Sequence, residues 1–123
     1  MAITQAMSTL FKKDVLLGDH HLDTDVIMIA LYTSSATLNA TTDGYITSGQ
    51  VANGNGYTTG GVALANKAVT EDTNSGSTTA GSGIFDAADP EWTSATFTAR
   101  GALIYNKTLG DASSNSRGAI AIL

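Results

Sequence analysis

The densest group of chemically active side chains lies in residues 19–25, whose sequence is DHHLDTD. Histidine and aspartate are ligands that hard or borderline cations accept. In an extended segment His21, Asp23 and Asp25 would share one face, so these three are the candidate metal ligands. Their spacing matches no established metal loop, and the alternative is a polar connection whose aspartates bond to nearby backbone groups. We therefore expect no metal and no cofactor.

Catalytic motifs are missing from the sequence. Serine, histidine and aspartate are all present, but there is no Gly-x-Ser-x-Gly nucleophile elbow. Glutamates are scarce and show no sign of the paired carboxylates that cleave glycosidic bonds. Residues 54–61, GNGYTTGG, lack the Gly-Lys-Ser/Thr ending of a phosphate-binding loop and predict a tight turn instead. We expect that the protein is not an enzyme.

Aromatic side chains offer a second possible site. Trp92, Tyr45, Tyr57 and Tyr105 could form a platform on which a sugar ring stacks. The alternative is that these four residues anchor the core and the turns, which is the commoner role of scattered aromatic residues. Both interpretations stay open from the sequence alone.

Composition excludes several classes of protein. The 123 residues predict a single domain, 1–123. A net charge of −5 with only six lysines and arginines argues against a nucleic-acid partner, because phosphate contacts need basic side chains. The chain has no cysteine and no apolar run long enough to span a bilayer, so we expect neither disulfides nor a membrane partner. A small-molecule ligand is not expected either.

The periodicity of apolar residues predicts a mainly β fold with one helix. Apolar positions about 3.6 residues apart predict a helix over residues 3–17, ended by Gly18 in the left-handed conformation. Apolar or alternating runs predict the strands, which are residues 25–32, 62–70, 84–88, 95–105 and 119–123. The fold class is therefore a small β-sandwich or open barrel, with residues 1–18 as an N-terminal helix or arm and residues 19–123 as the β domain.

Two features of the predicted strands concern pairing. Gly101 lies within an apolar strand and predicts a bulge or a close approach of another backbone. The apolar run at residues 119–123 would invite another chain if its edge were unpaired, so we expect that it pairs inside the sheet or that the natural chain continues beyond it.

Docking residues are predicted on the helix and on one strand. The apolar helix residues Ile3, Met7, Leu10 and Phe11 are the candidate interface, with the polar loop 71–83 as a second candidate. Arg100 lies inside an apolar strand and is either an interface arginine or an outward side chain bonded to a local aspartate.

The order of segments along the chain resembles a family of small virion structural proteins of tailed bacteriophages. The segments that are most specific are ALY at residues 30–32, GYTTGG at 56–61 and TARGALIYN at 98–106. The resemblance covers nearly the whole chain. It implies a capsid cement or decoration protein on the capsid surface, whose partners are the major capsid protein and copies of itself.

Other virion roles remain open beside the cement protein. They are a tail or head-fibre protein, an adaptor or ring-forming protein, and an adhesin that binds a host glycan through its loops. For a cement protein we expect that deleting residues 1–12 abolishes particle binding without unfolding the sheet.

Overall fold

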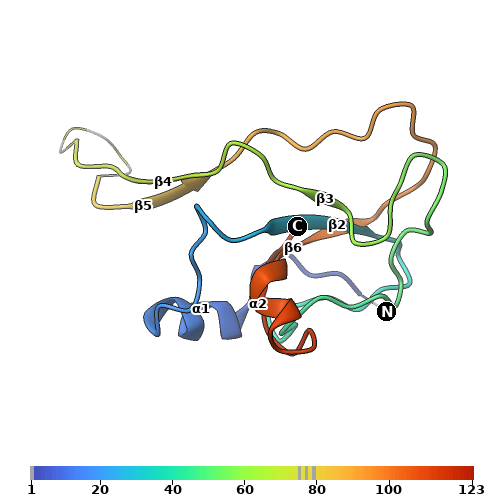
Figure 1. The fold of residues 1–123 in the computed structure, drawn as a ribbon, viewed down its shortest axis with the longest axis horizontal. Coiled ribbons are helices and arrows are strands. Elements are labelled where there is room, and N and C mark those ends of the chain that lie inside the picture. The colour runs from blue at the N-terminus through green and yellow to red at the C-terminus, as the bar shows by residue number, and fades with distance from the viewer. Residues whose placement is uncertain (1, 75, 77, 79) are drawn as a thin grey trace.

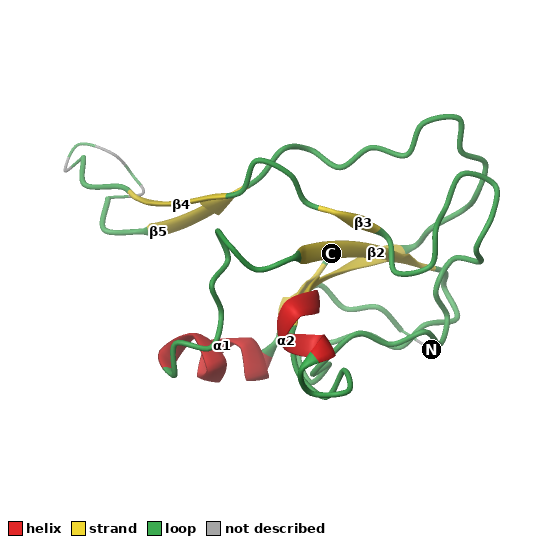
Figure 2. Cartoon of the chain, viewed as in Figure 1, coloured by secondary structure: helices red, strands yellow, loops and turns green. Residues whose placement is uncertain are grey.

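The computed structural model describes residues 2–74, 76, 78 and 80–123. The chain is mainly β, with two sheets, as expected for a small β-sandwich, and the described residues form no closed barrel (Figures 1 and 2). The elements in chain order are β1 (Ala6–Met7), α1 (Thr9–Leu16), β2 (Ile27–Tyr32), β3 (Val62–Ala63), β4 (Ala68–Glu71), β5 (Gly83–Asp86), β6 (Gly101–Asn106), α2 (Lys107–Asp111) and β7 (Ala119–Ile122).

A five-stranded sheet forms the centre of the molecule, in the order β1-β7-β6-β2-β3. Its longest pairing joins β2 to β6 in antiparallel register, from Ile27 opposite Asn106 to Tyr32 opposite Gly101. The C-terminal strand β7 lies between β1 and β6, so the apolar end of the chain pairs inside the sheet rather than forming an open edge. The prediction that this run pairs inside the sheet is therefore confirmed.

Side chains alternate between the two faces of this sheet, and both faces are covered. In β2, Ala30 and Tyr32 belong to one apolar cluster, while Ile27 and Ile29 belong to the other. The long loop after β2 covers the first face, where the Tyr32 hydroxyl donates to the Ile46 carbonyl at 2.6 Å. The segment that returns from β5 to β6, drawn in orange in Figure 1, runs along the opposite side of the sheet.

The N-terminal helix is shorter than predicted. Residues 3–7 are extended: Ile3 forms a parallel bridge with Leu38, and β1 pairs with β7. Ser8 precedes α1, but its hydroxyl donates to the Thr42 carbonyl at 2.8 Å and does not cap the helix. The prediction of helix over residues 3–7 was wrong because strand partners far along the chain take up the backbone hydrogen bonds of this segment. Gly18 follows the helix with a φ of 75°, as predicted.

Two predicted strands are shorter or divided. The run 62–70 splits into β3 and β4, which belong to different sheets, and Asn66 between them has a φ of 52°. The run 95–105 is a strand only from Gly101 onward. The polar connection after it contains a helix that was not predicted, α2, whose N-terminus is capped by Asn106.

Gly101 is a site of close approach, as its position predicted. A Cβ atom there would lie 2.8 Å from Ile3 Cγ2 and 2.9 Å from the Leu123 carbonyl oxygen. The bulge lies elsewhere, between Ile104 and Tyr105 where β6 meets β7.

Candidate functional site

Residues 19–25 form a turn rather than an extended ligand face. The His21 carbonyl accepts the backbone N–H groups of Thr24 and Asp25, at 3.0 and 2.7 Å. The Asp25 carboxylate in turn accepts the His21 N–H at 3.0 Å. His21 and Asp23 are exposed, so His21, Asp23 and Asp25 do not converge on one point. Over the part of the chain that the structure describes, no three histidine, cysteine or acidic side chains could hold a metal ion together.

Asn106 connects this turn to α2 from the buried end of β6. Its side-chain oxygen accepts the Leu109 N–H at 3.0 Å and so caps α2. Its side-chain nitrogen donates to the Asp25 carboxylate at 2.7 Å and lies 3.2 Å from His20 Nδ1. Asn106 is fully buried, which is tolerated because both ends of its amide have partners.

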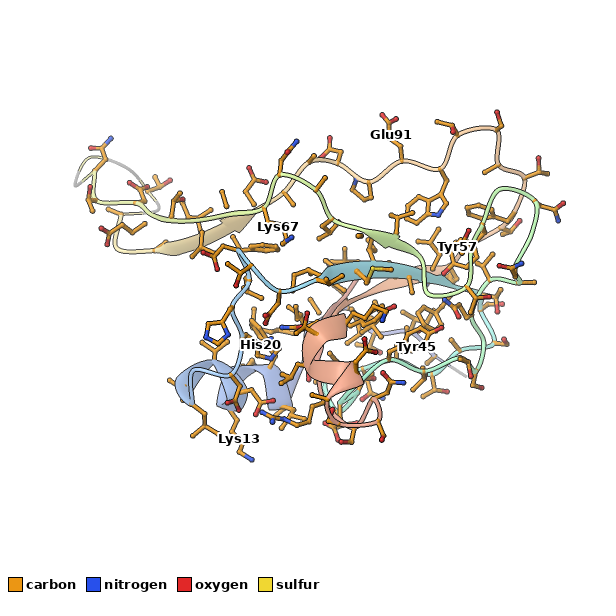
Figure 3. The ribbon with its side chains drawn as sticks, in the orientation of Figure 1. Lys13, His20, Tyr45, Tyr57, Lys67 and Glu91 are labelled. Atoms are coloured by element: carbon orange, nitrogen blue, oxygen red, sulfur yellow. The ribbon has the colours of Figure 1, made fainter. Side chains whose placement is uncertain are left out.

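His20, rather than His21, is the histidine that points into the molecule, and Figure 3 shows it between α1 and α2. The His20 and Phe11 rings form a T-shaped pair with their centroids 4.7 Å apart. When Nδ1 accepts from Asn106, the proton is on Nε2, which is buried without a partner among the described residues. Burial lowers the pKa of His20, although the Asp14 and Asp25 carboxylates act in the opposite direction.

A pH titration tests this environment. Because the pKa of His20 is lower in the folded protein, the unfolded chain binds the proton more readily. The free energy of unfolding should therefore be highest above the ordinary histidine pKa of about 6.5 and fall as the pH drops below it. The measurement is urea unfolding from pH 7.5 to 5. His20→Gln should flatten this fall, whereas the exposed control His21→Gln should keep it; equal slopes in both variants would contradict the assignment.

An ion-pair cluster fastens the end of α1 to the turn before β7. The Arg117 guanidinium contacts the two carboxylate oxygens of Asp14 at 3.2 and 3.1 Å, and it also pairs with Asp19. Asp14 is buried, so this guanidinium neutralises a charge that water does not reach. The hydrogen bonds that the guanidinium donates, chiefly to Asp19 and next to Asp14, raise the pKa of Arg117. The cluster therefore fixes the position of α1 on the sheet.

The aromatic residues do not form an exposed platform. Tyr57 and Tyr105 are buried, and Tyr105 stacks on Tyr45 with ring centroids 4.8 Å apart. The Tyr57 hydroxyl accepts the Leu31 N–H and the Gln50 side-chain amide, at 3.0 and 2.8 Å. Trp92 is half-buried between Tyr57 and Phe97. These four aromatic residues anchor the core and its covering loops.

The predicted interface residues lie in different surroundings. Phe11 is buried in the core, and Ile3 packs against the other core cluster beside Gly101. Met7 is exposed on β1, and Leu10 lies half-exposed beside a hollow of about 340 Å³. Arg100 is exposed, and its side chain has no partner in the described part of the chain. Of the five, Met7, Leu10 and Arg100 present side chains to the surface.

The end of α1 carries three consecutive exposed apolar side chains. Val15, Leu16 and Leu17, which we call the α1 apolar end, are 47, 88 and 63% exposed. Val15 also lines a hollow of about 450 Å³ that extends to Val69 of β4. A signal for this surface was present in the sequence: three consecutive apolar residues cannot all face the core from one helix.

Comparison with known protein families, curated proteins and solved structures finds no match to this chain. In the described residues, no helix has the length and apolar character needed to cross a membrane.

Proposed function

We propose that this chain is a structural protein of a tailed-bacteriophage particle, a capsid cement protein that binds across neighbouring major capsid subunits. The order of segments along the sequence supports the proposal by resemblance. The observation that carries it in three dimensions is the α1 apolar end, where Leu16 and Leu17 are consecutive in the chain and both exposed. A contiguous exposed apolar patch favours a protein-binding role.

The chemistry of the α1 apolar end indicates the character of the surface that it meets. Lys12 and Lys13 precede it on α1 and are exposed, although the whole chain has a net charge of −5. Figure 3 shows the Lys13 side chain pointing away from the body. The docking surface on the shell subunit should therefore be apolar with acidic residues at its rim. Burying one leucine on docking stabilises the complex by about 1.5–3 kcal/mol.

Cementing needs contact with more than one shell subunit. A protein that touches two neighbouring subunits stabilises their arrangement because it binds only the assembled shell tightly. The projecting hairpin of β4 and β5 lies at the same end of the molecule as α1 (Figure 1). This end is where we place the seam between subunits.

The α1 apolar end can be tested without disturbing the core. Leu16→Ser with Leu17→Ser should weaken binding to particles that lack the chain by about a hundredfold, because about 3 kcal/mol of apolar burial is lost. The measurement is cosedimentation of the purified variant with particles from a phage whose copy of the gene is deleted. Val26→Thr, which changes another exposed apolar residue to one of similar size, is the control and should bind as the unaltered chain does.

Quantitative mass spectrometry of purified particles decides between the virion roles. A copy number comparable with that of the major capsid protein supports a cement protein. A copy number far below it would replace the proposal with a tail, fibre or adaptor role, and absence from the particle would overturn it.

A further inference from the structure

The hairpin of β4 and β5 forms a sheet of its own, separate from the five-stranded sheet. It projects beyond the body of the molecule (Figures 1 and 2), and every residue of β4 is exposed. A two-stranded hairpin has two open edges and is only marginally stable alone in water. An additional strand on one edge would stabilise it.

Hydrogen bonding within the hairpin shows which backbone groups of β4 are free to pair. The Asp72 N–H donates to the Ser82 carbonyl at 2.9 Å, in register with the pairing of Thr70 with Ile84. Because bonded and non-bonded pairs alternate in an antiparallel ladder, the backbone groups of Val69 and Glu71 point away from β5. Lys67 precedes β4 by one residue. If the same alternation continues to it, its backbone groups also point away from β5.

These outward residues complement a second copy of themselves. If two β4 strands pair antiparallel about Val69, then Val69 lies opposite Val69, and Lys67 of each copy lies opposite Glu71 of the other. Opposite charges facing each other across strands stabilise a sheet by about 0.2–1 kcal/mol per pair. In the described part of the chain neither Lys67 nor Glu71 forms an ion pair, so both are available. Figure 3 shows Lys67 near the base of the hairpin.

The other edge of the hairpin offers no such match. By the same alternation β5 presents Gly83 and Phe85, which have no charge to meet Lys67 or Glu71. Pairing of β4 with β5 of the next copy would repeat from copy to copy and continue into a fibre, whereas pairing of β4 with β4 uses the same edge of both copies and closes after two. Charge and closure both favour the symmetric arrangement.

We propose that two copies of this chain join through their β4 strands, antiparallel about Val69, into a four-stranded sheet, with Lys67 of each copy paired to Glu71 of the other. This dimer is independent of capsid binding and is measured on the purified chain. A failure of the dimer therefore leaves the cement proposal standing, and the reverse also holds.

Charge reversal gives the decisive test, by analytical ultracentrifugation of the full chain. Lys67→Glu places like charges opposite each other in the dimer, and Glu71→Lys does the same. Each variant alone should dimerise at least tenfold more weakly than the unaltered chain. An equimolar mixture of the two should recover dimers, because each facing pair is then again of opposite charge, and the double variant should recover them as well.

Cross-linking supplies a second measurement. The chain has no cysteine, so a single introduced thiol reports one position. Val69→Cys should form a disulfide-linked dimer under mild oxidation because residue 69 faces itself across the two-fold axis. The exposed control Ile84→Cys, whose backbone faces β4 within the hairpin, should cross-link much less. A monomeric unaltered chain at 100 µM in the centrifuge, single variants that dimerise normally, or a mixture without recovery would each overturn the proposal.

Discussion

Replacing Gly61 by alanine should strongly destabilise the fold. A Cβ atom at this position would lie 1.9 Å from the Ile29 carbonyl oxygen and 2.6 Å from its carbon, far inside van der Waals contact. Gly61 directly precedes β3, which pairs with β2, so relieving the clash means separating these two strands. We expect the free energy of unfolding to fall by about 4 kcal/mol or more, which is a large part of the roughly 5–15 kcal/mol that is usual for a domain. The measurement is thermal unfolding followed by circular dichroism.

Gly18→Ala is the matched control for Gly61→Ala. Gly18 and Gly61 have similar φ angles, 75° and 84°, so both substitutions impose left-handed backbone strain. A Cβ atom on Gly18 would meet nothing within 4 Å. Gly18→Ala should therefore lower the free energy of unfolding only by the backbone strain, about 1–2 kcal/mol. Equal melting temperatures for the two variants would contradict the close approach of Gly61 to β2.

Deleting residues 1–12 should unfold much of the sheet. This corrects the expectation, drawn from the sequence, that the segment is a separable docking arm. The deletion removes β1 with its pairing to β7, the hydrogen bond from the Ser8 N–H to the Ile120 carbonyl, and the buried ring of Phe11. Loss of a buried phenylalanine side chain alone costs about 3 kcal/mol. Urea unfolding should show a broad transition or none.

Met7→Ser provides the control for the deletion, because Met7 is exposed on β1 and its side chain contributes little to the core. The urea concentration at the midpoint of its unfolding should be nearly that of the unaltered chain. A truncated chain with the midpoint of the intact one would show that residues 1–12 are an arm after all. If the truncation unfolds the sheet as expected, loss of particle binding after it says nothing about docking, and the α1 apolar end is the sharper test.

The candidate site was only partly predictable. The sequence drew attention to residues 19–25, but it selected His21 and Asp23, which the structure leaves exposed, and passed over His20. His20 is set apart by its contact with Asn106, which is 86 residues away along the chain. Asp14 is set apart by its hydrogen bond from Arg117, which is 103 residues away. A local pattern contains no information about partners so distant. The α1 apolar end was not predicted either, although the sequence carried a local signal for it, because three adjacent apolar residues exceed what one helix face can bury.

The sequence by itself determined the fold class and the positions of the strands that form the core of the sheet. Apolar runs predicted β2, β7 and the end of β6, since a strand buried on both faces needs nearly every side chain to be apolar. Tertiary structure decided the state of residues 3–7, the separation of β3 from β4, and the side chains that meet around Asn106. The physical reason is that periodicity reports that a residue is buried, whereas its burial partner is chosen by pairing across the whole chain. Ile3 and Ala6 fit a helical spacing equally well, and only the bonds to Leu38 and to β7 make this segment a strand.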